Sequence, residues 1–249
     1  MIVESAASPS YAVREPRPTL GDVVSSLARR AVVPGLVSAL VLFAIGWLIM
    51  GPLGGLTAEE EISKSAARGR TAAMDEVTHV WSSSTDTFTA IGLGIAFSLA
   101  VWALSRRWWW GLAPIAALTL ESSVFVPVTN IVDRPRPDVL FLDAAPPTSS
   151  FPSGHTAAAF ALYLTLALLA ARIPWRLPRL VVQVACVVWP FLVAYARLYR
   201  GMHLLSDIVI GALFGIWCAW TIAHALPGVW PFGRTAVDRE VRARALDRG

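Results

Sequence analysis

The feature that most constrains this chain is a series of apolar runs, each close to the length needed to cross a bilayer. A transmembrane helix needs about 20 predominantly apolar residues. Charged residues make up only 15% of the 249 residues, against about 25% in a typical soluble domain. The sequence therefore predicts an all-α, polytopic membrane protein with six transmembrane helices. Their expected limits are 32–52, 87–105, 109–128, 155–171, 180–198 and 204–225.

The basic residues indicate an orientation rather than a nucleic-acid partner. The formal net charge is +4, but in a membrane protein the positions of Lys and Arg matter more than their sum. With the N-terminus in the cytoplasm, fourteen of the 21 basic residues fall on the inner side and seven on the outer side. This excess favours cytoplasmic N- and C-termini and a place in the plasma or inner membrane. We expect no nucleic-acid partner, and the oligomeric state stays open.

Three regions are expected along the chain. Residues 1–31 are polar, which predicts a loosely structured cytoplasmic tail, and they lack the features of a cleavable signal peptide. Residues 32–225 are expected to form a membrane domain of six helices. Residues 226–249 are expected to form a basic cytoplasmic tail.

A polar loop, 54–86, separates the first two predicted spans. Near its start, Thr57 is followed three residues later by Glu60, and this spacing fits a capping box at the start of a helix. We therefore expect a short helix within the loop.

Three polar segments fall on the outer side in this topology, each where a span begins or ends. Interfacial arginines are expected mainly on the inner side, and alone they could simply extend to lipid headgroups. Two of the four histidines, His155 and His203, lie in these segments together with Asp207, which favours anion chemistry. The segments are TNIVDRPRPD (129–138), FPSGH (151–155) and ARLYRGMHLLSD (196–207).

The residue types in these segments fit phosphoryl transfer. Such a reaction needs fixed positive charge around the phosphate oxygens and a nucleophile in line with the leaving group. Arg136 and Arg197 can donate charged hydrogen bonds. Ser153 and Gly154 stand at the start of a span, where free N–H groups of a helix N-terminus favour an anion.

The histidines supply the reactive groups in this interpretation. His203 and Asp207 are four residues apart, so on a helix they would share a face. Asp207 could then accept the N–H of His203 and leave the other ring nitrogen free to attack phosphorus. His155, from a different span, could protonate the departing oxygen.

Together the three segments resemble the motifs of the type 2 phosphatidic acid phosphatase family, which is related to vanadium haloperoxidases and glucose-6-phosphatase. The family pattern P-S-G-H is matched in full by residues 152–155. In the pattern S-R-x5-H-x3-D, Arg197, His203 and Asp207 match, while Ala196 replaces the serine. In the pattern K-x6-R-P, Arg136 matches but Thr129 replaces the lysine.

The resemblance implies roles for these residues and a class of substrate. It implies that His203 forms a phosphohistidine, that Asp207 orients it and that His155 is the general acid. Arg136, Arg197, Ser153 and Gly154 would bind phosphate without a metal cofactor. The expected activity is a membrane lipid phosphatase with its site at the outer membrane interface. The partner would be a lipid phosphate such as a polyprenyl diphosphate, phosphatidylglycerophosphate or phosphatidic acid.

The replacement of lysine by Thr129 removes one cation from the expected phosphate site. A hydrogen bond to a charged group is worth roughly 1.5–3 kcal/mol, so we expect another cation to replace it. Arg134 is the first candidate for this auxiliary role and Arg200 the second.

Other functions remain open on the sequence alone. A transport or lipid-scrambling protein could bind anionic headgroups on the same scaffold, although a binder needs charge rather than a His–Asp pair. A vanadate-dependent haloperoxidase would share the anion site, but six membrane spans argue against it. A family member with altered or lost chemistry is the third alternative, because of Thr129.

Overall fold

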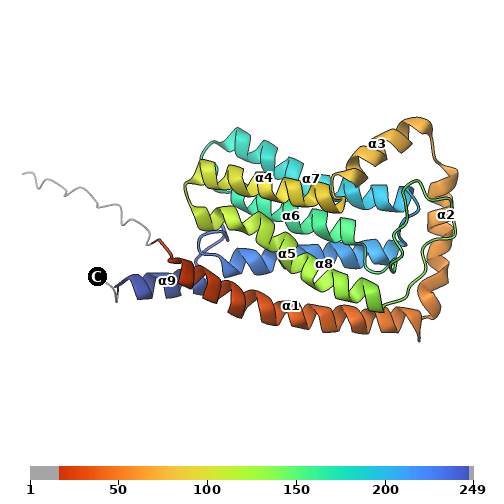
Figure 1. The fold of residues 1–249 in the computed structure, drawn as a ribbon. Coiled ribbons are helices and arrows are strands. Elements are labelled where there is room, and N and C mark those ends of the chain that lie inside the picture. Colours follow the sequence, from red (N-terminus) through yellow and green to blue (C-terminus); the bar gives the residue numbers. More distant parts are fainter. Residues whose placement is uncertain (1–16, 247–249) are drawn as a thin grey trace, which may run out of the picture.

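The computed structural model describes residues 17–246, and within this range it contains helices and no strands (Figure 1). Six long helices form a bundle, with η1, α2 and α3 at one end and α9 at the other. The long helices are α1 (Leu20–Met50), α4 (Thr87–Ser105), α5 (Trp108–Ile131), α6 (Gly154–Ala170), α7 (Arg176–Tyr199) and α8 (Leu205–Ala225). The short elements are η1 (Gly54–Glu59), α2 (Glu60–Arg68), α3 (Ala72–Ser83) and α9 (Ala236–Leu246).

Five of these helices, α1, α4, α5, α7 and α8, are long and apolar enough to cross a membrane. The prediction of an all-α, multi-pass membrane protein is therefore confirmed. Helix α6 is also apolar, but it has only 17 residues and is roughly 26 Å long at about 1.5 Å per residue. Helices α5, α7 and α8 pack around α6 and bury most of its side chains. That α6 is a sixth span stays a prediction.

The predicted limits of the last five spans lie within four residues of the observed helices. The first helix differs, because α1 begins at Leu20 rather than near Val32. Thr19 caps it, since the Thr19 side chain accepts from the Asp22 N–H while the Asp22 carboxylate accepts from the Thr19 N–H. This capping box fixes the first turn. The prediction of a loose tail is wrong for residues 20–31, while residues 1–16 lie outside the described part of the chain.

The C-terminal segment also folds further than expected. Within 226–249, α9 returns to the first turns of α1, where Glu240 pairs with Arg29 and Arg30. Arg244 pairs with Asp22 at 2.7 Å. The segment is basic, as the sequence indicates, but it also contains Glu240, whose carboxylate pairs with two arginines of α1.

The predicted short helix in loop 54–86 is confirmed by α2 and α3. The predicted capping box at Thr57 is wrong, because Glu59 occupies the cap of α2 and provides no side-chain hydrogen bond. Glu60 instead accepts a hydrogen bond from the Asp138 N–H at 3.1 Å. Loop 54–86 is thereby attached to the segment that follows α5.

Close packing between α6 and α8 positions the polar end of the bundle. The sequence GALFG (211–215) places Gly211 and Gly215 four residues apart on α8. A methyl group on Gly211 would lie 2.6 Å from the Ser153 carbonyl oxygen. A methyl group on Gly154 would likewise lie 2.6 Å from the Phe125 ring. Small residues therefore let the start of α6 lie directly against α5 and α8, as small-residue helix contacts do in membranes.

Candidate active site

The three polar segments meet at the end of the bundle that carries α2 and α3 (Figure 1). The Ser153 N–H donates to the Asp207 carbonyl at 3.0 Å. Arg136 Nη1 donates to the Met202 carbonyl at 2.7 Å. These contacts join the start of α6 to the first turn of α8, and the loop after α5 to the turn between α7 and α8, so residues distant in sequence share one site.

His203 is held by the backbone in a defined tautomer. Its side chain is buried, with 4% of the residue exposed. Its Nδ1 lies 2.7 Å from the Ser150 carbonyl oxygen. A carbonyl oxygen only accepts hydrogen bonds, so Nδ1 carries the proton and donates it. In the neutral ring, Nε2 therefore bears the lone pair that a nucleophile requires.

The surroundings of His203 keep the ring neutral. Burial lowers the pKa of His203 well below its usual range, and the positive charges of Arg197 and Arg136 lower this pKa further. A neutral imidazole retains its lone pair at neutral pH. The arginines that suit a phosphate thus also favour the reactive form of His203.

The predicted contact between Asp207 and His203 is not formed. Helix α8 begins at Leu205, so His203 lies in the preceding turn, and the four-residue spacing does not put the two side chains on one helix face. Asp207 instead turns back and accepts from the Leu204 N–H at 3.0 Å. It also accepts from Ser150 Oγ at 2.6 Å and from Arg134 Nη1. Asp207 is thus connected to His203 through Ser150, whose hydroxyl group contacts Asp207 and whose carbonyl group contacts His203.

His155 has a carboxylate partner that the sequence did not indicate. Its Nε2 lies 2.8 Å from Asp86 Oδ1, at the residue that precedes α4. An ionised carboxylate only accepts, so Nε2–H donates to Asp86. This contact fixes the ring and leaves Nδ1 as the nitrogen that can face a leaving group.

Arg136 and Arg197 each present a donor with no partner within residues 17–246. The Nε atom of each is buried and has no hydrogen-bond acceptor in that range. Buried N–H groups are nearly always paired in folded proteins. These two donors, beside His203, therefore suit the oxygen atoms of a bound phosphate.

The start of α6 supplies backbone donors. The first backbone bond at its start runs from the Ala157 N–H to the Ser153 carbonyl, so the N–H groups of residues 154–156 have no acceptor within the helix. The Ser153 side chain is buried and contacts Thr156 Oγ1 at 2.9 Å. Gly154 lies too close to Phe125 for any larger residue. This helix N-terminus favours an anion.

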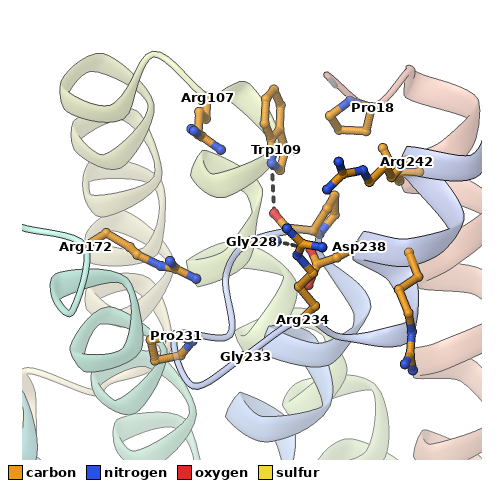
Figure 2. Close-up of a pocket in the computed structure, with 13 residues that line it drawn as sticks. Pro18, Arg107, Trp109, Arg172, Gly228, Pro231, Gly233, Arg234, Asp238 and Arg242 are labelled. Carbon is orange, nitrogen blue, oxygen red and sulfur yellow. Dashed lines mark hydrogen bonds between the residues drawn. The ribbon is translucent and has the colours of Figure 1, made fainter. Parts of the chain in front are cut away.

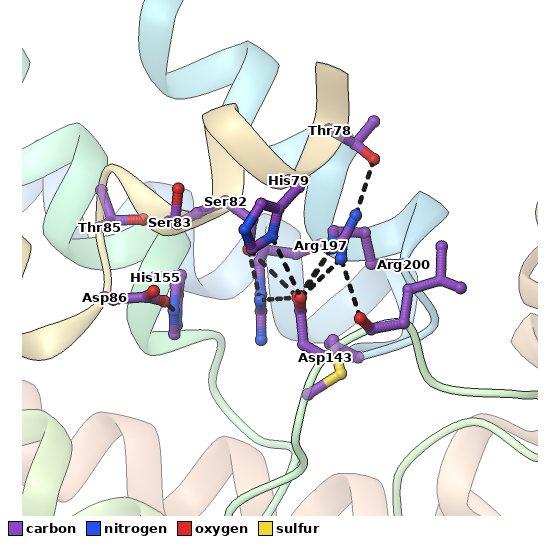
Figure 3. A network of polar contacts seen from close by, with 12 residues as sticks. Thr78, His79, Ser82, Ser83, Thr85, Asp86, Asp143, His155, Arg197 and Arg200 are labelled. Carbon is purple, nitrogen blue, oxygen red and sulfur yellow. Dashed lines mark hydrogen bonds and ion pairs between the residues drawn. The ribbon is translucent and has the colours of Figure 1, made fainter. Parts of the chain in front are cut away.

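A carboxylate from the loop after α5 bridges two of the predicted arginines (Figure 3). Figure 3 shows Arg197 and Arg200 directed toward Asp143, with Arg197 Nη1 at 2.9 Å and Arg200 Nη2 at 2.7 Å. Ser82 of α3 also receives a hydrogen bond from Arg197 at 2.7 Å. Burial raises the pKa of the Asp143 carboxyl, but the hydrogen bond from Arg200 and the charges of Arg197 and Arg200 outweigh it, so the net pKa is lowered.

The two auxiliary arginines have carboxylate partners of their own. Arg134 is buried and pairs with Asp207 and, at 3.5 Å, with Glu59 of η1. Arg200 pairs with Asp143. Thr129 is buried and donates to the Ser149 carbonyl at 3.2 Å. Both guanidinium groups therefore pair with carboxylates of the protein. Their predicted role in place of the family lysine stays a prediction.

Four residues of the site follow from no motif: Ser82, Asp86, Asp143 and Ser150. Ser150 directly precedes FPSGH, and its carbonyl and hydroxyl groups contact His203 and Asp207. The other three come from α3, the turn before α4 and the loop after α5. Within the described range, no group of three or more His, Cys, Asp or Glu residues could hold a metal ion.

Two curated proteins are similar in sequence. Lipid A 4'-phosphatase of Bacteroides thetaiotaomicron is 39% identical over 79 residues, which cover 30% of this chain and 32% of that relative. The chain therefore spans about a third of that relative's length. Phosphatidylglycerophosphatase B of Bacillus subtilis is 29% identical over 169 residues, which cover 64% of this chain and 79% of that relative.

Two solved structures share the fold. A transmembrane PAP2-type phosphatidylglycerolphosphate phosphatase from Bacillus subtilis superposes with a TM-score of 0.63 at 23% identity, covering 75% of this chain and 92% of that chain. LpxE from Aquifex aeolicus gives a TM-score of 0.52 at 25% identity, covering 65% and 92%. Residues 108–230, which contain all three motif segments, match the profile of the PAP2 superfamily. Residues 108–230 of this chain therefore belong to the PAP2 superfamily.

Proposed function

We propose that this protein is an integral membrane phosphatase that removes a phosphate group from a lipid. The observation that carries the proposal is the state of His203. Its Nδ1–H is engaged by the Ser150 carbonyl, its pKa is lowered by burial and by Arg197 and Arg136, and its Nε2 is left as a neutral nucleophile. Two buried arginine Nε–H donors stand beside it.

The reaction proceeds in two steps. Nε2 of His203 attacks the terminal phosphorus and forms an N–P bond as the P–O bond to the leaving group breaks. The leaving group is a lipid alkoxide for a phosphomonoester and a lipid monophosphate for a diphosphate. His155, protonated on both ring nitrogens, gives its Nδ1 proton to the departing oxygen while Nε2–H stays on Asp86. Water then attacks the phosphohistidine, His155 takes a proton from that water, and inorganic phosphate leaves. Arg136, Arg197 and the start of α6 stabilise the charge on the phosphoryl oxygens in both steps.

The substrate class is supported by the place of the site and by the relatives. The site lies at one end of a bundle whose helices carry exposed apolar side chains such as Trp47 and Phe191. A lipid could therefore reach it from the membrane. The relatives are named a lipid A 4'-phosphatase and a phosphatidylglycerophosphatase. We infer a lipid phosphomonoester or diphosphate, with phosphatidylglycerophosphate, phosphatidic acid and a polyprenyl diphosphate as the compounds to test.

We also propose that the site faces the outside of the plasma or inner membrane. In Figure 1 the first residues of α1 and helix α9 lie at the end of the bundle opposite α2 and α3. Placing that end in the cytoplasm puts fourteen of the 21 basic residues inside, as the positive-inside rule requires. Cysteines introduced at residues 140–148 of the protein in intact cells should then react with an impermeant thiol reagent, and cysteines at 235–244 should not.

Arginines and backbone N–H groups carry the phosphate charge in this proposal, so the reaction needs no metal ion. Phosphate release should continue in EDTA, and vanadate should inhibit it by occupying the phosphate position. Activity that is lost with chelator and restored by Mg²⁺ would replace the arginine site with a metal-dependent one.

A panel of purified lipid phosphates in detergent tests the function. Wild type should release inorganic phosphate from at least one lipid, and His203→Ala should lose roughly a thousandfold or more of that rate while keeping its helical circular dichroism. Full activity in His203→Ala would remove the covalent mechanism. A wild type that binds the lipids but releases no phosphate from any of them would instead favour the lipid-binding or transport alternative.

A further inference from the structure

A second arginine-lined pocket lies at the other end of the bundle (Figure 2). It has a volume of about 520 Å³ and lies between the α4–α5 turn, the α6–α7 turn and the segment that leads from α8 into α9. Helix α8 begins beside His203 and ends beside this pocket, and it has 21 residues. At about 1.5 Å per residue the two sites are roughly 30 Å apart, so the pocket is not part of the candidate active site.

The pocket carries a strong excess of positive charge. Three of its arginines, Arg234, Arg239 and Arg242, have exposed side chains and no carboxylate partner within residues 17–246. The full set of charged lining residues is Arg107, Arg172, Arg234, Arg239, Arg242 and Asp238.

The single carboxylate does not offset this charge by pairing with an arginine. Asp238 accepts from the Gly228 N–H at 2.7 Å. It also accepts from the Thr235 N–H at 2.6 Å and from Thr235 Oγ1 at 2.8 Å. Its oxygens therefore cap α9 and close the turn at Gly228, which has a φ of +71° and so favours glycine. Arg234, Arg239 and Arg242 therefore line the pocket without a carboxylate partner in the described residues.

Tryptophans hold the pocket wall in place. Trp109 and Trp110 both donate from Nε1 to the Pro227 carbonyl at 3.0 Å. The Arg107 guanidinium lies 4.5 Å from the Trp110 ring centre, and that of Arg172 lies 5.9 Å from it. Cation–π contacts orient an arginine without cancelling its charge. The pocket is thus preformed for an anion.

Two exposed aromatic side chains lie close in sequence to residues that line the pocket: Trp175 follows Arg172 by three positions, and Phe232 lies between Pro231 and Gly233. Trp175 in the α6–α7 turn is 71% exposed, and Phe232 beside the lining residues is 75% exposed. Tryptophans are enriched where a membrane meets water, and basic pockets between transmembrane helices suit anionic headgroups. The ligand that reaches this pocket most directly is one already anchored in the membrane.

We propose that this pocket binds the phosphodiester headgroup of an anionic phospholipid. Arg234, Arg239 and Arg242 bind its phosphate oxygens, and Phe232 and Trp175 contact the acyl-chain boundary. The site would attach the α9 end of the bundle to the membrane surface, and it does not depend on the proposed phosphatase activity.

The test is lipid binding by the purified full chain in neutral detergent, followed by native mass spectrometry. The probes are dioleoyl phosphatidylglycerol, cardiolipin and dioleoyl phosphatidylcholine. The pocket triple variant is Arg234→Gln with Arg239→Gln and Arg242→Gln. The matched control removes three arginines from the same end but outside the pocket, as Arg106→Gln with Arg176→Gln and Arg179→Gln. We expect the pocket triple to lose roughly tenfold or more of the affinity for the anionic lipids, while the control and phosphatidylcholine binding change little.

Equal losses in the two triples would overturn the proposal, because the effect would then be general electrostatics at this end. If inorganic phosphate or glycerophosphoglycerol bound the pocket as tightly as the lipids, the site would belong to a soluble anion and the lipid assignment would be wrong. Should the triple not fold, Arg242→Gln alone should still weaken anionic lipid binding more than Arg176→Gln. Phosphate release should stay at the wild-type rate in the pocket triple, which separates this result from a failure of the proposed function.

Discussion

The candidate active site at one end of the helix bundle and the pocket at the other end use arginine in opposite ways. At the end with α2 and α3, Arg134, Arg197 and Arg200 are buried and pair with carboxylates. At the end with α9, Arg234 and Arg242 are exposed and have no carboxylate partner in the described residues. The same residue type thus supplies a buried, paired charge in one site and an exposed, solvated charge in the other.

This difference follows from what each end would have to bind. A buried and oriented charge needs little rearrangement when charge develops in a transition state, and burial protects it from salt. An exposed charge attracts a headgroup from the membrane surface and lets it exchange, but salt weakens that attraction. The comparison therefore predicts chemistry at one end and reversible binding at the other.

The largest difference is expected between two separate variants, each of which replaces one arginine at one end of the bundle. Arg197→Gln removes a buried donor and should lower phosphate release by roughly a hundredfold to a thousandfold. Arg234→Gln should leave the rate and the thermal midpoint near those of wild type, since its side chain is exposed. The measurement is kcat on the best lipid of the panel, with melting followed by circular dichroism. Similar losses in both variants would erase the distinction between the two ends.

A smaller effect is expected when the partner of His155 loses its charge. Asp86→Asn keeps an oxygen that can accept a hydrogen bond from His155 Nε2–H, so the imidazole ring should stay in place. Without the carboxylate charge, His155 should transfer its proton to the leaving group more slowly. We expect kcat on a lipid phosphate to fall by about tenfold to a hundredfold. An aryl phosphate, whose leaving group needs little protonation, should be affected much less. Glu76→Gln, on the exposed face of α3, is the control. An equal loss on both substrates would assign Asp86 a structural role only.

The pH profile tests the charges around His203. Positive neighbours disfavour the imidazolium and lower its pKa, so removing one should raise that pKa. In Arg136→Gln the acidic limb of the kcat/KM profile should therefore move to higher pH. Arg68→Gln, on α2, should leave the limb in place. A limb that does not move in Arg136→Gln would show that His203 is not the group titrating there.

The smallest effect is expected at Thr129. A cavity of about 530 Å³ lies beside it, lined also by Arg136 and Ser149, so the longer side chain of Thr129→Lys has room. We expect a folded enzyme whose activity rises or broadens by less than about tenfold. Thr129→Met, similar in length but uncharged, separates charge from bulk. If wild type were inert on every lipid and Thr129→Lys gained turnover, the native protein would be a specialised binder.

The sequence predicted the long helices because apolar periodicity and length are local signals. It did not predict the early start of α1, although Thr19 and Asp22 form a recognisable capping box. Nor did it predict α9, whose ion pairs join residues about two hundred positions apart. Contacts of that range leave no pattern in a short window.

The motif residues of the candidate site were predictable from the sequence, but the residues that contact them were not. The motifs placed His203, His155, Arg136 and Arg197 at one end of the bundle. The assumption that His203 and Asp207 share a helix failed because α8 starts two residues after His203. Asp86 and Asp143 could not be found from sequence, because they come from a turn and a loop that only the tertiary fold brings to His155 and Arg197.

The most direct test of the account is to trap the covalent intermediate. The enzyme is mixed with the lipid that it hydrolyses best, quenched in alkali to preserve a phosphohistidine, digested and examined by tandem mass spectrometry. The account predicts a phosphoryl group at Nε2 of His203, on the peptide that contains this residue. A His155 variant should give a larger yield of this phosphopeptide, because loss of His155 should slow hydrolysis of the phosphohistidine more than it slows its formation. Two results would contradict the account. One is the release of phosphate that carries ¹⁸O from labelled water while neither protein yields a phosphorylated peptide. The other is a phosphoryl group on a different residue.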